Sequence, residues 1–350
     1  MGVLTMIFTL KRGVVFKRMS AAFALCAFIY IGTTPVSAQF RGSQGNTFTY
    51  EELYDEPYSI NKLFIMFQPL YGELYVANVN VGFGLEAHYY LKDKLDFRGH
   101  ARKTYTSKFD FSRDIAEKNS NVDNIPSVYN YYELGATYHV VDKEEDTETK
   151  IILYSKRYKG RKWAAKVPDH SSVPSKVRKI YGVRVGGLAF DTSTDLNRAL
   201  ESQGSSLVDT DGNPIDTDAI IFGNFDAKAV YLGGSSAWIK NFAIKPDKSY
   251  SELASDLIFT TFLDIIFAPS VNVEDILYNG QTFSSEPIKT SKLGFRAGME
   301  GKFNREFGWA YGAEMGYRPG IKKRSFYALV KISFPVFSTS LSHSKEAFGK

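Results

Sequence analysis

The sequence has little cysteine, no long apolar run beyond its N-terminal region and almost no net charge outside that region. The one cysteine, Cys26, lies inside the N-terminal apolar segment, so the rest of the chain can form neither a disulfide nor a thiol-based site. No later run reaches the roughly 18 uncharged residues that a membrane helix needs. This excludes a helical-bundle membrane protein and a disulfide-stabilised scaffold.

Residues 1–38 have the features of a secretory signal peptide. An uncharged, mostly apolar run begins at residue 19, and Val36-Ser37-Ala38 is a cleavage site of small residues. The basic residues that precede the run are Lys11, Arg12, Lys17 and Arg18. A single transmembrane anchor is the alternative, but the polar residues at 33–37 favour cleavage and export.

Charge argues against a nucleic-acid partner. Cleavage after Ala38 removes four of the 43 lysine and arginine residues and no acid, which leaves 39 basic residues against 38 acidic ones. A near-neutral chain lacks the basic excess that binds phosphate backbones.

The strongest pattern is an alternation of apolar and polar side chains over residues 78–91. Odd positions from Val79 to Leu91 are apolar or tyrosine, whereas even positions are mostly polar or glycine, and the pattern resumes after a polar turn at 92–94. Successive side chains of a strand point to opposite faces. Strands of this length fit a bilayer crossing, which needs roughly 9–11 tilted residues, better than a soluble sandwich with strands of roughly 5–6.

Further segments extend this pattern into a barrel. Alternation recurs at 130–141, 293–303, 307–317 and 326–336, and strand-like segments with mixed facing lie at 150–157, 179–191, 228–240 and 255–268. The ten clearest strands leave the short turns near Asp93 and Asn304 on opposite sides of the membrane. A weaker strand at 161–167 restores their agreement, and 63–70 then supplies the first strand and an even total. The sequence therefore predicts an all-β fold, a transmembrane antiparallel β-barrel of about 12 strands, with about 10 or 14 as alternatives.

The same strand assignment predicts the organisation of the chain. The barrel spans 61–338, after a periplasmic or lumenal segment at 39–60 and before a periplasmic tail at 339–350. The long connections 107–128, 192–226 and 271–290 are polar, and on this topology they face the cell exterior.

Four stretches carry a family resemblance. They are the junction Ser37-Ala38-Gln39, LGFRAGMEGKF from Leu293, GWAYGAEMGYRPG from Gly308 and YALVKISFPVF from Tyr327. In these stretches the chain resembles small outer-membrane β-barrel proteins of the Bacteroidota. The resemblance implies a location in the cell outer membrane and brings no catalytic residues. Such barrels often end on an aromatic residue of the last strand, whereas thirteen residues follow Phe337 here.

The inner face predicted for the barrel carries many charged side chains. With Asp93 at the centre of the first turn, Glu86 lies opposite His100 and His88 lies opposite Arg98. The full predicted set is Glu86, His88, Asp96, Arg98, His100, Arg102, Arg184, Asp264, Arg296, Glu300, Glu314 and Lys331. These residues would form either a charged constriction that selects permeants or ion pairs that fill a narrow barrel. The second interpretation is favoured because small barrels fill themselves with side chains.

No cofactor, metal or catalytic site is predicted. The weak candidate for Ca²⁺ is the cluster Asp209, Asp211, Asp216 and Asp218, but Gly212 directly follows the second aspartate, so the spacing is not that of an EF-hand and a tight turn is favoured. The inner histidines lack the HExxH or cysteine spacing of a zinc site. His139 and Ser155 lie on adjacent predicted strands, but no motif singles out a nucleophile.

Two functions are consistent with these features. The first is an outer-membrane barrel that is porin-like or structural, and the second is an accessory barrel subunit of a larger outer-membrane assembly, secretion or transport complex. A barrel-embedded lipid-modifying enzyme is a weaker third. Small outward residues would mark a protein contact in the second case, although alanine is also tolerated against lipid; they are Ala87, Ala101, Ala136 and Ala313. The expected partners are outer-membrane lipid and, in the second case, other outer-membrane proteins.

Overall fold

The computed structural model describes residues 48–91, 94–154, 162, 166–209, 212–215, 219–247, 252–305 and 308–339. Every described residue belongs to one compact unit, Thr47–Lys350. The predicted signal peptide and all but the first residue of the predicted tail therefore lie outside the described residues. Within the described part, no helix has both the length and the apolar character to cross a membrane.

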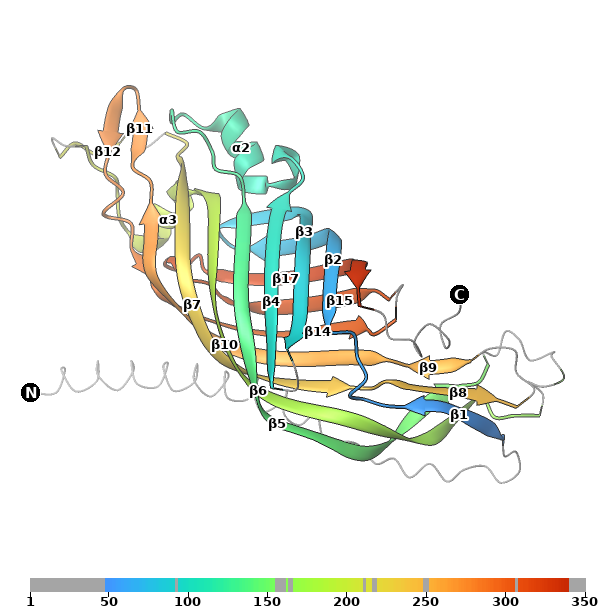
Figure 1. Cartoon of the computed structure of the whole chain (residues 1–350). Coiled ribbons are helices and arrows are strands. Elements are labelled where there is room, and N and C mark those ends of the chain that lie inside the picture. Colours follow the sequence, from blue (N-terminus) through green and yellow to red (C-terminus); the bar gives the residue numbers. More distant parts are fainter. Residues whose placement is uncertain are drawn as a thin grey trace, which may run out of the picture. The chain divides into compact units, whose positions relative to one another are not determined.

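Ten antiparallel strands form a closed barrel (Figure 1). Each barrel strand pairs with the next one along the chain, and the last pairs with the first. In chain order the strands are β2 (Leu63–Tyr75), β3 (Asn78–Leu91), β4 (Leu95–Thr104), β5 (Asn130–Ile152), β6 (His170–Asp195), β7 (Phe222–Ile239), β10 (Leu257–Val273), β14 (Leu293–Phe303), β15 (Ala310–Tyr317) and β17 (Phe326–Ser338).

The predicted all-β barrel is confirmed, but the main prediction of twelve strands is wrong and the alternative of ten is correct. Residues 130–141 and 150–157 were predicted as two strands, whereas residues 130–152 form one strand, β5. The charged stretch between them continues the ladder with β6, because Asp142 lies opposite Ile180 and Lys150 opposite Ser172. The predicted strand 161–167 falls largely outside the described residues and contributes no barrel strand, while 63–70 forms the first part of β2.

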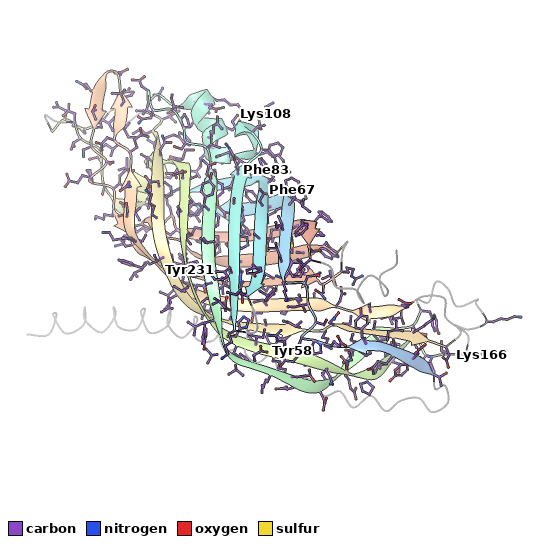
Figure 2. The ribbon with its side chains drawn as sticks, in the orientation of Figure 1. Tyr58, Phe67, Phe83, Lys108, Lys166 and Tyr231 are labelled. Carbon is purple, nitrogen blue, oxygen red and sulfur yellow. The ribbon has the colours of Figure 1, made fainter. Side chains whose placement is uncertain are left out.

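Outward and inward faces follow the predicted alternation. Along β3 the even positions are buried, and the odd positions are partly or fully exposed. Two residues labelled in Figure 2 illustrate the two faces: Phe67 of β2 is 41% exposed, whereas Tyr231 of β7 is 4% exposed. In β2 one extra residue between Gln68 and Tyr71 forms a bulge at Pro69, which has no N–H to donate to the ladder.

The barrel has two different ends. At the end that we call the loop end lie the long connections between β4 and β5, β6 and β7, and β10 and β14, so the three predicted long loops do share one end. The loop end contains η1 (Ser107–Phe109), α2 (Phe111–Asn119), α3 (Leu196–Gln203), the hairpin of β11 (Ile276–Tyr278) and β12 (Gln281–Phe283), and the pair β13 (Thr290–Ser291) and β16 (Gly320–Ile321). At the opposite end, the terminal end, β2 begins and β17 finishes.

A second sheet extends the terminal end. β1 (Tyr50–Asp55), β8 (Phe242–Pro246) and β9 (Leu253–Ser255) form three antiparallel strands, and Figure 1 shows them beside the ends of β5 and β6. Phe242 and Ile244 of β8 pack against Ile151 of β5 and Val173 of β6 in one buried cluster. We call this body, made of β1, β8, β9 and the ends of β5 and β6, the terminal extension. It places residues 50–55 of the predicted N-terminal segment in a sheet.

Asp110 connects the β4–β5 loop to the barrel. Its carboxylate caps α2 by accepting the Arg113 N–H at 3.2 Å, and it also accepts the Asn78 side-chain amide at 2.7 Å and the Tyr129 N–H at 3.1 Å. Burial raises the pKa of the Asp110 carboxyl, and these hydrogen bonds oppose that rise.

We expect Asp110→Ala to lower the free energy of unfolding by about 1–3 kcal/mol, because α2 loses its cap and buried donors of Asn78 and Tyr129 lose their acceptor. Urea titration and hydrogen exchange of α2 measure the effect. The matched control is Asp114→Ala in the same helix, where a partly exposed pair with Lys118 is lost and a change within about 0.5 kcal/mol is expected. Equal losses in the two variants would contradict the role of Asp110.

Candidate functional site

The charged side chains predicted for the inner face lie inside the barrel. All twelve belong to barrel strands, and each of them except Arg102 has an ion-pair partner within 4.0 Å among the described residues. The strand pairing is as predicted for the first hairpin, where Glu86 lies opposite His100 and His88 opposite Arg98. The predicted residues form three connected groups, centred on Arg296, Lys331 and Asp96.

Arg296 of β14 is the most completely paired cation. Its Nε lies 2.9 Å from Asp264 Oδ2 of β10, and its two terminal nitrogens lie 2.9 and 2.5 Å from the two oxygens of Glu133 of β5. Asp264 Oδ1 also forms an ion pair with Arg184 of β6, whose Nε lies 3.1 Å away. The Arg296 guanidinium stacks 4.5 Å from the Tyr231 ring, and the residue is 1% exposed. Bidentate pairing of this kind satisfies buried charges on both partners.

Lys331 of β17 links β3 and β14. Its ammonium lies 2.9 Å from Glu86 Oε2 and 2.8 Å from Glu300 Oε1, and Glu300 also pairs with Arg98 at 3.4 Å. Glu86, Glu300 and His100 have ligand atoms close enough together to hold a metal ion. The Lys331 ammonium already contacts both carboxylates, so the charge that a metal ion would supply is provided by the chain itself.

Asp96 of β4 accepts two imidazoles. His88 Nε2 lies 3.0 Å and His139 Nε2 lies 2.9 Å from its two oxygens, and Arg98 Nε lies 3.4 Å away. Lys302 of β14 contacts the other ring nitrogen of His88. The histidines therefore serve as hydrogen-bonded members of the network. Ser155, considered with His139 as a nucleophile pair, lies outside the described residues.

A fourth group, centred on Arg318, was not predicted. Arg318, which follows β15, forms a bidentate pair with Glu73 of β2 at 2.9 and 2.6 Å, and the Tyr129 hydroxyl donates to Glu73 at 3.2 Å. Glu314 of β15 lies 3.7 Å from Arg318 and 3.9 Å from Arg296, so it joins this group to the Arg296 group.

Arg102 of β4 differs from the other predicted residues. It is 3% exposed, and its guanidinium stacks 4.9 Å from the Tyr131 ring. Its Nε and Nη1 atoms have no hydrogen-bond partner among the described residues. The ring contact, rather than an ion pair, positions this cation.

The sequence contained partial signals for the residues that were missed. Glu133, His139 and Lys302 alternate with apolar residues on their strands, which places them on the inner face, but alternation does not identify the residue across the barrel. Glu73 lies beyond the predicted end of the 63–70 strand, because the bulge at Pro69 interrupts the period. Arg318 follows the last residue of β15, where the Pro319-Gly320 turn signal predicts the end of the strand.

The charges inside the barrel balance. Among the described residues, seven carboxylates belong to the connected groups and their neighbourhood, Glu73, Glu86, Asp96, Glu133, Asp264, Glu300 and Glu314, and seven cations accompany them, Arg98, Arg102, Arg184, Arg296, Lys302, Arg318 and Lys331. A buried apolar cluster that includes α3 lies toward the loop end, and a smaller one around Phe64 and Ile258 lies toward the terminal end. Buried side chains thus occupy the interior near the loop end, in the charged middle and near the terminal end.

Of the four aspartates in the predicted calcium cluster, only Asp209 lies within the described residues. The Asp209 carboxylate accepts the Asn213 N–H at 2.7 Å and the Asn213 side-chain amide at 3.1 Å, and Gly212 has a φ of +85°. These contacts form a local turn. Asp211, Asp216 and Asp218 lie outside the described residues.

Comparisons with known proteins give no family. No protein-family model matches the chain. No curated protein matches it. Among solved structures, the chain is similar to the crystal structure of the P. putida toluene transporter TodX, at 9% identity over 79% of this chain and 88% of that chain, with a TM-score of 0.18. A similarity at this level carries no argument about function.

We expect Arg296→Met to lower the free energy of unfolding by about 3–5 kcal/mol, because Glu133 and Asp264 keep buried charges without their main partner. Urea titration of the protein in lipid vesicles, followed by tryptophan fluorescence, measures this. Arg296→Lys retains the charge but not the bidentate geometry, so its free energy of unfolding should lie between those of Arg296→Met and the wild type. As a control, Lys176→Met removes an exposed pair with Glu144 and should change the value by about 0–1 kcal/mol. An Arg296→Met effect no larger than this control would contradict the role of the network.

Proposed function

We propose that the chain is an outer-membrane β-barrel with a filled interior and a structural role in the envelope, rather than a porin. The observation that carries this proposal is the charge-balanced network inside the barrel, which lies between two apolar clusters. A permeation pathway needs water or permeant where these side chains lie. The interior of a small barrel is narrow enough for side chains to fill it.

The outward face supports a lipid environment. Leu134, Ile265 and Val336 are 69%, 66% and 67% exposed on three different barrel strands. In a soluble antiparallel sheet, one such face would pack on a second layer. On β6 the outward apolar or small positions run from Tyr181 to Ala189, and this span of nine residues agrees with the roughly 9–11 needed to cross a bilayer.

Aromatic side chains gather at both ends of this band, as they do where a barrel meets the membrane interfaces. Near the terminal end Phe303, Trp309 and Tyr311 form a run with centroid distances of 5.9 and 5.2 Å. Near the loop end the corresponding run is Phe295, Tyr317 and Phe326, at 5.3 and 5.6 Å.

The conductance of a planar bilayer tests the filled interior. Folded, heat-modifiable protein reconstituted at single-molecule density should give no steady open-channel current, because paired charges and apolar side chains exclude a continuous water path. A known porin reconstituted in the same way is the positive control. Reproducible single-channel steps from the folded protein would overturn the structural role in favour of the porin-like one.

A second function, an accessory subunit of a larger outer-membrane complex, is supported by the terminal extension. Beyond the apolar band, β5 and β6 carry ion pairs that reach water: Lys176 pairs with Glu144 at 3.0 Å, and Lys179 pairs with Glu145. The Arg178–Asp142 pair beside them is largely buried. The three-stranded sheet on these ends has its own buried cluster. A folded body of this kind, on the side where the barrel begins and finishes, is a surface suited to periplasmic contacts.

A pair of photo-crosslinking positions tests the subunit hypothesis in native membranes. A crosslinker at Glu52, exposed on β1, should capture one defined envelope protein that also co-purifies stoichiometrically in mild detergent, because β1 is an edge strand with unpaired backbone groups. The control position is Lys118, exposed on α2 at the opposite end. Equal capture at both positions, or recovery of the chain alone, would contradict this second function.

A further inference from the structure

A groove of about 860 Å³ lies on the outward face of the barrel. Its outward lining follows two adjacent rows of paired residues that cross β3, β4, β5, β6 and β7 in register. The row nearer the terminal end contains Ala87, Gly99, Leu134, Gly187 and Val230. The row nearer the loop end contains Leu85, Ala101, Tyr132, Ala189 and Lys228.

The groove is hollow because small and large side chains are segregated along these rows. Ala87 and Gly99 are direct partners, and Gly187 and Ala189 occupy successive outward positions of β6. Leu134 is 69% exposed between Gly99 and Gly187, so it stands as a wall above them. Among the outward residues that line the groove, Lys228 at one end is the one charged side chain, and the others offer a mostly apolar surface that fits a hydrocarbon chain.

A polar pocket of about 520 Å³ lies next to the groove on the loop-end side. The next outward row of β4, β5, β6 and β7, continued onto β10, lines it, with Lys103, Asn130, Asp191, Asp226 and Asn272 as successive partners. Each of the first four lies two residues closer to the loop end than the residue of its strand in the nearer groove row. Residues two apart on a strand share a face, so the pocket lies directly beyond the groove. The change from apolar to polar occurs within one row.

Three carboxylates, Asp191, Asp226 and Glu274, and one cation, Lys103, line this pocket, a pattern that the ammonium of a zwitterionic ligand complements. Asp191 and Asp226 are direct cross-strand partners, and like charges at such positions destabilise a sheet unless a cation lies between them. Asn272 donates to both oxygens of Asp226, at 3.3 and 3.1 Å. Two cations flank this pair. Lys103 of β4 lies in the same row as Asp191 of β6, with Asn130 of β5 between them, and Lys228 lies two residues from Asp226 on the same face of β7.

We propose that the groove and the pocket together bind a phospholipid with a phosphoethanolamine headgroup, with its ammonium between Asp191 and Asp226, its phosphate near Lys103 or Lys228 and its hydrocarbon in the groove. The proposal rests on the membrane location proposed above. A headgroup that carries phosphate alone would place an anion beside two carboxylates. A quaternary choline ammonium has no N–H to donate to them. The pocket therefore selects ethanolamine over both.

Native mass spectrometry of the full processed chain in detergent tests this selectivity. Phosphatidylethanolamine, phosphatidylglycerol and phosphatidylcholine with identical acyl chains are the three probes. Wild type should retain phosphatidylethanolamine about tenfold more strongly than the other two, the size expected for one charge-assisted hydrogen bond. Asp191→Asn combined with Asp226→Asn should remove that preference, whereas Glu51→Gln combined with Glu52→Gln, two exposed acids of the terminal extension, should keep it.

A pair of alanine variants tests the groove itself. Ala101→Leu fills the groove and should weaken retention of all three lipids, whereas Ala313→Leu, at an outward alanine of β15 outside the groove lining, should not. Equal retention of the three lipids by wild type would overturn the proposal, as would an unchanged preference in the aspartate variant. Preference for phosphatidylglycerol in the presence of Mg²⁺ would overturn it in favour of a cation-bridged phosphate. Failure of the membrane location has a separate readout, namely chain that stays soluble without detergent.

Discussion

Pairing of buried charge is the constraint on which the rest of this barrel depends. An isolated charge removed from water costs several kcal/mol, so each interior carboxylate requires its cation to arrive in register. Lys331 of β17 meets Glu86 of β3, and Arg296 of β14 meets Glu133 of β5. Lys331 reaches past the intervening strand β2, whereas β10, β7 and β6 lie between Arg296 and Glu133 on the shorter way round the barrel, so the second pair crosses the interior. The network therefore stabilises the closed circle of strands as a whole, and a slip of one residue in any strand would turn its charges toward the outer face.

Much of this fold follows from period alone. Alternation over residues 78–91, together with one short turn, was enough to predict a barrel, the facing of β3 and the opposition of Glu86 and His100. Partners across the interior were beyond such reasoning, because alternation fixes the face of a residue but not the residue opposite it. The strand count failed for a related reason: the acidic run after Asp142 resembles a loop, yet it forms ion pairs with the basic run of β6 around Arg178.

β5 and β6 are long strands that each run from the barrel into the terminal extension. Their loop-end halves carry the outward apolar band, and their terminal halves carry paired surface charges and the cluster beneath β8. The barrel and the terminal extension thus share continuous backbone, without a flexible linker between them. Asn61 strengthens this connection, because its backbone N–H and its side-chain amide donate hydrogen bonds of 2.8 Å to Oδ1 and to the backbone carbonyl of Asn304 in the β14–β15 turn. A force or a partner acting on the extension would be transmitted directly to the wall of the barrel.

A filled interior moves the search for function to the outer surfaces. Inward positions are constrained by charge pairing and packing, but alternation leaves each outward position free of those demands. Nothing in the interior network requires alanine at position 87 or glycine at 187, since a larger outward side chain would leave the ion pairs untouched. The hollow over these residues, and the Asp191–Asp226 pair beside it, therefore call for an explanation outside the barrel. A ligand that contacts both the apolar groove and the Asp191–Asp226 pair would explain both features, neither of which the fold itself requires.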